Sequence, residues 1–179
     1  MSRLTLIFAF CLALLGLSSC SSPAFVQPQG DVYAQCGFRF EKGRHLTTNY
    51  IGKGDFVAAG SKVLIVKVGQ KDFVVQLEDG RQVEIENIEK FTLLGIKAIS
   101  ERMFAATAPV LSGLSAAELA AVKAGRIEVG MSKKAVLLAV GYPPAHESSI
   151  SSDSWLYWQS RFNKQRIEFV NDRVSAVRN

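Results

Sequence analysis

The chain has 179 residues, of which 48% are hydrophobic, so it is long enough for one ordinary domain or two small ones. Its net charge of +5 comes from Lys and Arg residues that are dispersed along the chain, a pattern that gives nucleic-acid binding little support. A small positive net charge is compatible with a location beside anionic lipid head groups, and it is equally compatible with a role in solubility alone.

Residues 1–19 have the pattern of an export signal. Arg3 supplies a positive start, and an apolar run follows from Leu4 to Leu17. Because this run is shorter than the roughly 20 residues of a membrane-spanning helix, we interpret it as a cleaved signal peptide. Its removal takes away one Arg and no acid, which lowers the net charge from +5 to +4.

Cys20 follows in Leu17-Ser18-Ser19-Cys20, which resembles a lipobox. Lipidation needs a thiol at the first mature position and small residues before it for the peptidase. We therefore expect Cys20 to carry the lipid that anchors the protein in a membrane. By resemblance to the sorting rules of lipoproteins in bacteria with two membranes, Ser21 favours the outer membrane, on its periplasmic face.

Residues 20–45 are expected to form a tether. The part up to Gly30 is rich in Ser, Pro, Gln and Gly, whereas the part from Asp31 has aromatic residues without helical periodicity and leaves open whether it begins a folded module. Cys36 is left without an assigned role, and a bridge to Cys20 is open only if Cys20 carries no lipid.

Residues 46–108 are expected to form a small β module with a trailing helix. The run Val63–Val68 is rich in β-branched residues, and the stretches on either side of the hairpin signal Asp79-Gly80 alternate apolar and polar residues. Short strands at this spacing favour a curled sheet or barrel of the SH3-like type. Helical spacing returns over Thr92–Ala106.

Residues 113–179 begin with two predicted helices. Ser115-Ala116-Ala117-Glu118 has the spacing of a capping box, and Gly125 suits the end of that helix. The second helix starts after Ser132 and stops at Gly141-Tyr142-Pro143-Pro144. It lacks an acidic partner for its cap, and Lys133-Lys134 oppose the helix dipole, so it needs tertiary burial for stability.

Three antiparallel strands are expected after the loop from Ala145 to Asp153. The first contains Trp155–Phe162, the second has Ile167 and Phe169 on its core side, and Asn171-Asp172 favours a hairpin turn with positive φ. Two helices packed on such a meander form an α+β layer.

These signals in the last third of the chain resemble the SmpA/OmlA family, the BamE-like small lipoproteins of the bacterial outer membrane. The matching residues are Gly130-Met131-Ser132, Val136, Gly141 with Pro143, Trp155 with Tyr157, and Phe169 with Arg173-Val174. The resemblance implies a module of two helices and a three-stranded antiparallel sheet. The expected fold is therefore α+β, with a small SH3-like module followed by a BamE-like module.

The chain shows no catalytic pattern. His45 and His146 lie in expected loops without a Cys or His at ligand spacing, and the serines around His146 fit an ordinary turn without a Gly-x-Ser-x-Gly elbow. The glycines Gly52 and Gly54 are not followed by a helix, as a phosphate-binding loop requires. We expect no enzyme activity, no cofactor and no metal.

The aromatic strand is the best candidate for binding. Alternation places Trp155 and Tyr157 on the face opposite Trp158, and the sequence leaves open which face the helices bury. The other face would offer aromatic area of the kind found in protein contacts, unless the β module or a loop covers it. With a basic rim, the residues expected to bind a partner are Tyr142, Trp155, Tyr157, Trp158, Arg161 and Arg173.

The expected function is that of a lipoprotein that serves as a binding or scaffold module in outer-membrane assembly or envelope maintenance. Its expected contacts are the membrane, through Cys20, and an envelope protein, with anionic lipid or peptidoglycan as further candidates. Two alternatives are an inhibitor-like module, because the β-lactamase inhibitor protein fold has a related helix–helix–sheet layout, and a cell-wall binder that uses the SH3-like module.

Overall fold

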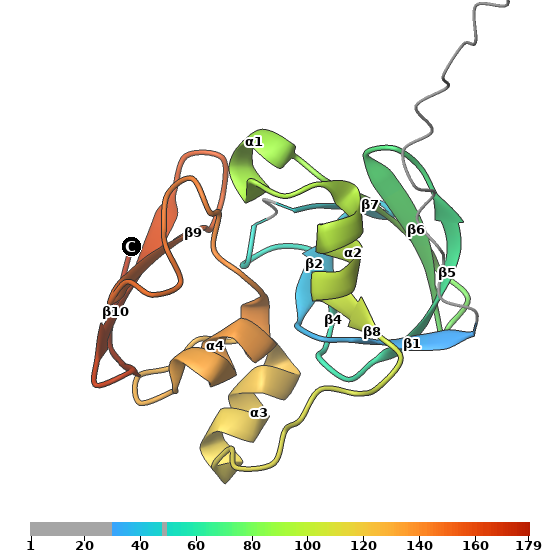
Figure 1. Ribbon diagram of the computed structural model, residues 1–179. Coiled ribbons are helices and arrows are strands. Elements are labelled where there is room, and N and C mark those ends of the chain that lie inside the picture. The colour runs from blue at the N-terminus through green and yellow to red at the C-terminus, as the bar shows by residue number, and fades with distance from the viewer. Residues whose placement is uncertain (1–29, 48–49) are drawn as a thin grey trace, which may run out of the picture.

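The computed structural model describes residues 30–47 and 50–179, so the signal peptide, Cys20 and the first part of the tether lie outside the described residues. Four helices and three sheets make the described part a mixed α+β structure, as expected (Figure 1). Among these helices, none has the length and apolar character needed to cross a membrane.

Six strands form the largest sheet, in the order β3-β7-β6-β5-β1-β8. Their bounds are β1 Asp31–Ala34, β3 Arg44–Leu46, β5 Lys62–Val68, β6 Asp72–Leu77, β7 Gln82–Glu86 and β8 Phe104–Ala105. Neighbours pair antiparallel except β3 and β7, which pair parallel. The predicted hairpin at Asp79-Gly80 is confirmed, and Gly80 has the positive φ of +84° that a glycine tolerates without strain.

Four shorter elements complete this first module. Strands β2 (Phe38–Phe40) and β4 (Asp55–Val57) form a separate two-stranded sheet. Helices α1 (Glu89–Thr92) and α2 (Ile96–Met103) connect β7 to β8. The predicted helix over 92–106 is present as α2, which is shorter at both ends, whereas α1 lies before that range except for Thr92. Ile99 and Met103 face the core of the module, as their helical spacing predicted.

Residues 31–46 belong to the folded module, which corrects the expected tether over 20–45. Strand β1 lies between β5 and β8, where Val32 and Ala34 are buried, and Phe38 and Phe40 of β2 join the same core. The strands β1, β2 and β3 have only three or four residues each, so each is too short to show a clear alternation of apolar and polar residues in the sequence.

The closing module packs two helices, α3 (Ala116–Ala124) and α4 (Lys133–Val140), on one face of a three-stranded sheet. Its antiparallel order is β11-β10-β9, with bounds β9 Ser154–Trp158, β10 Lys164–Val170 and β11 Arg173–Arg178. The predicted turn at Asn171-Asp172 is confirmed by φ values of 51° and 59°. The first strand ends at Trp158, four residues before the expected end at Phe162.

Helix α3 has the complete capping box that the sequence predicted. The Ser115 hydroxyl accepts a hydrogen bond from the backbone N–H of Glu118 at 3.2 Å, and the Glu118 carboxylate accepts one from the backbone N–H of Ser115 at 2.9 Å. Gly125 ends the helix in the left-handed conformation, with φ of 61°.

Tertiary contacts supply helix α4 with the N-terminal hydrogen bond and the negative charges that its own first turn lacks. Ser132 caps Ala135, and the backbone N–H of Ser132 donates to Oε1 of Glu118 at 2.9 Å, so one carboxylate serves the starts of both helices. Lys133 lies 2.8 Å from a carboxylate oxygen of Asp153 and 3.0 Å from one of Asp172. These two carboxylates offset the unfavourable charge of Lys133 in the first turn.

The two modules pack directly against each other. The backbone N–H of Gly37 donates to Leu138 O at 2.8 Å, and that of Ile51 donates to Trp158 O at 3.0 Å. A Cβ atom at Gly37 would lie 2.3 Å from Ala139 O, so only glycine permits this approach of the β module to α4. The expected boundary between modules is therefore a packed interface.

Candidate binding site between the two modules

A small cavity of about 70 Å³ lies at this interface. The β module lines it with Cys36, His45 and Arg102, and the closing module lines it with Tyr142 and Trp158, among others. This volume holds a few water molecules and is well below the roughly 300 Å³ at which pockets for small organic ligands begin. The cavity alone therefore does not accommodate such a ligand.

His45 is buried and neutral at the edge of this cavity. Its Nδ1 lies 2.7 Å from Arg39 O, and since a carbonyl oxygen only accepts, Nδ1 carries the proton. Burial lowers the pKa of His45 from 6.5 to about 4, partly opposed by the hydrogen bond to Arg39. The ring thus connects β3 to β2 as a neutral donor in the physiological pH range.

The thiol of Cys36 and the phenol of Tyr157 are also neutral. Burial raises the pKa of Cys36 to about 12, although the positive charge of Arg102 acts in the opposite direction. Burial likewise raises the pKa of Tyr157, whose hydroxyl donates to Gly141 O at 2.9 Å. These groups provide hydrogen bonds and packing, and none of them is an ionised nucleophile.

An open groove of about 590 Å³ lies on the outer side of the cavity. Its walls are α2, α4 and the connection after β8, all of which are near the centre of Figure 1. The guanidinium of Arg102 stacks over the Tyr142 ring at 4.3 Å from its centroid, and both residues line the groove as well as the cavity. The Arg102–Tyr142 pair is therefore a shared wall between the two spaces.

Strand β9 buries Trp155 and Tyr157, two of the expected binding residues, and turns Trp158 to its other face. Trp155 and Tyr157 are each 1% exposed in the core beneath α3 and α4, so a partner does not reach them in this structure. Trp158 points to the other face, where it is half-buried beside the cavity with Lys164 Nζ 4.8 Å from its ring centroid. Contact with the β module accounts for part of the burial of Trp158.

Trp158 also carries an unsatisfied polar group. Its Nε1 is buried and has no hydrogen-bond partner in the part of the chain that the structure describes, and the same holds for Nε1 of Trp155. A buried N–H without an acceptor costs free energy of folding.

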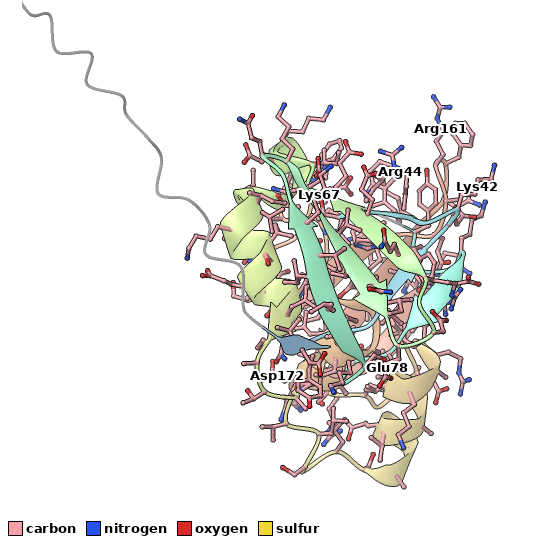
Figure 2. The ribbon with its side chains drawn as sticks, turned by 90° about the vertical axis from the view of Figure 1, so that its right-hand side faces the viewer. Lys42, Arg44, Lys67, Glu78, Arg161 and Asp172 are labelled. Carbon is pink, nitrogen blue, oxygen red and sulfur yellow. The ribbon has the colours of Figure 1, made fainter. Side chains whose placement is uncertain are left out.

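The remaining three expected binding residues lie in different places. Tyr142 is 36% exposed at the groove. Arg161 projects from the same side of the molecule as Lys42 and Arg44, whereas Asp172 lies on the opposite side, next in the chain to Arg173 (Figure 2). Because β10 separates Arg161 from Arg173, these two do not form one basic rim.

Arg173 instead has a structural contact. Its Nη1 donates to Gly130 O at 2.8 Å and lies 3.6 Å from the Glu118 carboxylate. It thus stabilises the segment between α3 and α4.

Sequence reasoning missed the residues that form the groove. Arg102 and Lys134 are 32 positions apart in the printed chain and come together only because α2 and α4 belong to modules that pack against each other. The sequence signal that pointed to this region was Tyr142, in the Gly-Tyr-Pro-Pro segment that ends α4.

The described residues contain no group of three or more His, Cys, Asp or Glu side chains that fits a metal ion. Comparison of the chain with protein-family models, with curated proteins and with solved structures gives no match.

Proposed function

We propose that the protein is a membrane-anchored lipoprotein of the bacterial outer membrane, held by lipid on Cys20 and facing the periplasm, that serves as a non-catalytic binding or scaffold module in envelope assembly or maintenance. The signal sequence and Cys20 support the anchoring. The observation that carries the binding role is the open groove between the modules, with the exposed Tyr142 ring held against Arg102 at its wall.

The SH3-like assignment of the first module is supported by its strand order. In the spatial order β7-β6-β5-β1-β8, the consecutive strands β5, β6 and β7 form an antiparallel meander. Strand β8, which follows the two helices α1 and α2, pairs with β1, the first strand of the module. That connectivity is typical of SH3-like barrels. The SmpA/OmlA-like assignment of the closing module is supported by two helices that cover one face of a three-stranded antiparallel meander.

Anchoring is tested by replacement of Cys20 with Ser. The wild-type protein should fractionate with outer membranes, and the Cys20→Ser protein should be released with periplasmic contents. A Cys20→Ser protein that still fractionates with membranes by itself would contradict lipid anchoring.

Partner binding is tested by photocrosslinking in the native envelope. A photoreactive amino acid at Tyr142 should capture one defined envelope component, and the same group at Val170, which is 61% exposed and does not line the groove, serves as the control. Identical products from both positions would refute a binding role for the groove. Co-sedimentation with purified peptidoglycan that is independent of Tyr142 would favour the cell-wall alternative.

A further inference from the structure

The groove between α2 and α4 has the size and the apolar walls of a small-molecule site. Its volume of about 590 Å³ lies within the range of roughly 300–1,000 Å³ that is usual for ligand pockets. Leu137 and Leu138 of α4 form one apolar wall, and Ala105, Pro109 and Val110 form the other. Val110 is 65% exposed, so this apolar surface is open to solvent.

Two positive side chains line the same groove, and neither is paired with a carboxylate of the described residues. No ion pair between described residues includes Arg102 or Lys134. Glu101 also lines the groove, and its carboxylate is paired with Lys97, which does not line it. Arg102 is half-buried and stacked on Tyr142, so its position is fixed. The lining of the groove therefore has one more positive side chain than negative side chains.

Lys134 is especially informative because it lies where a lysine is unfavourable. It occupies the first turn of α4, where the positive end of the helix dipole repels a cation. The charge of its neighbour Lys133 is offset by Asp153 and Asp172, but no carboxylate among the described residues pairs with Lys134. An anion in the groove would supply the missing counter-charge.

From this geometry we propose that the groove binds a single-chain amphiphile with an anionic head, either a carboxylate or a phosphate. The head lies between Arg102 and Lys134, where the guanidinium fork donates charge-assisted hydrogen bonds, and the chain lies along Leu137, Leu138 and Val110. This inference rests on the proposed binding role of the groove and names its ligand class. An acidic peptide matches the charge but makes less use of the apolar walls.

The test is a calorimetric titration of the mature chain carrying Cys20→Ser, which retains all described residues. The probes are dodecanoate, dodecyl phosphate and, as a neutral head, dodecyl maltoside, each below its micelle concentration. Both anionic probes should bind, and the neutral probe should bind at least about tenfold more weakly. Preference for one anionic head over the other identifies the head group. Equal binding of all three probes, or of none, would overturn the proposal.

Matched variants locate the site. Lys134→Met should weaken dodecanoate binding about tenfold, whereas Lys123→Met, on the exposed face of α3 outside the groove, should leave it unchanged. Val110→Glu, which adds a negative charge at the groove, should weaken binding, whereas Val129→Glu, at a site of 68% exposure elsewhere, should not. Wild-type affinity in both groove variants would refute the site.

The two proposals fail separately. If no amphiphile binds but a photoreactive group at Tyr142 captures an envelope protein, the binding role stands and the ligand class is wrong. If the amphiphile binds but the Cys20→Ser protein stays with membranes, the site stands and the anchoring proposal is wrong.

Discussion

Replacement of Glu118 by Gln should destabilise the protein strongly, because this one carboxylate serves two helices. Its Oε2 accepts from the backbone N–H of Ser115, and its Oε1 accepts from the backbone N–H of Ser132, each at 2.9 Å. The amide of Gln has one acceptor oxygen and one NH₂ group, so one of the two backbone N–H groups would face a donor. Glu118 is 6% exposed, so water does not easily replace the lost acceptor.

The magnitude follows from the pKa of Glu118. The hydrogen bonds from Ser115 and then Ser132 lower this pKa from 4.5 to about 2. That difference corresponds to about 3 kcal/mol of folding free energy at pH 7. Because the folded-state pKa is the lower one, this stability is complete above about pH 5 and is lost as the pH falls from there toward 2.

Urea denaturation followed by tryptophan fluorescence, from pH 7 to pH 2.5, measures this effect in the mature chain carrying Cys20→Ser. The gap between Glu118→Gln and the parent should be about 3 kcal/mol at pH 7 and should shrink toward zero near pH 2. Glu128→Gln is the control, because Glu128 pairs with Arg126 at the surface and should lose less than about 1 kcal/mol. A gap that does not change with pH would refute the assigned role of the carboxylate charge.

Three further predictions follow from the interface. Burial lowers the pKa of His45 from 6.5 to about 4, so the free energy of unfolding should fall by about 2–3 kcal/mol as the pH falls from 7 to 4. In urea denaturation over this pH range, His45→Phe should remove most of the pH dependence. Gly37→Ala should lower the free energy of unfolding by more than about 2 kcal/mol in urea melts, because the new methyl group meets Ala139 O; an unchanged midpoint would contradict the close packing of the modules. In the mature chain carrying Cys20→Ser, Cys36 should react with iodoacetamide at pH 8 at least about 100-fold more slowly than free cysteine, since its pKa is about 12, and unfolding in guanidinium should abolish the difference.

Local chemistry in the sequence was sufficient for the turns and helix ends. Asn171-Asp172 tolerates positive φ and forms the predicted hairpin, and Ser115 with Glu118 forms the predicted capping box, because each depends on residues within four positions of one another. The mixed α+β class followed from the same patterns. The strands β1–β3 were missed because three or four residues carry too little periodicity, and their strand identity depends on pairing with distant segments.

Only the tertiary structure decided which face of β9 is buried and where the candidate site lies. Alternation made the faces of Trp155 and Trp158 equivalent in the sequence, and the packing of α3 and α4 on the Trp155 side broke that equivalence. The groove likewise joins Arg102 of one module to Lys134 of the other, and no local pattern relates them. Short-range rules thus determined most of the helices and strands and their ends. The docking of the two modules determined the burial of the aromatic strand and the position of the groove, because local spacing in the sequence does not encode contacts between distant segments.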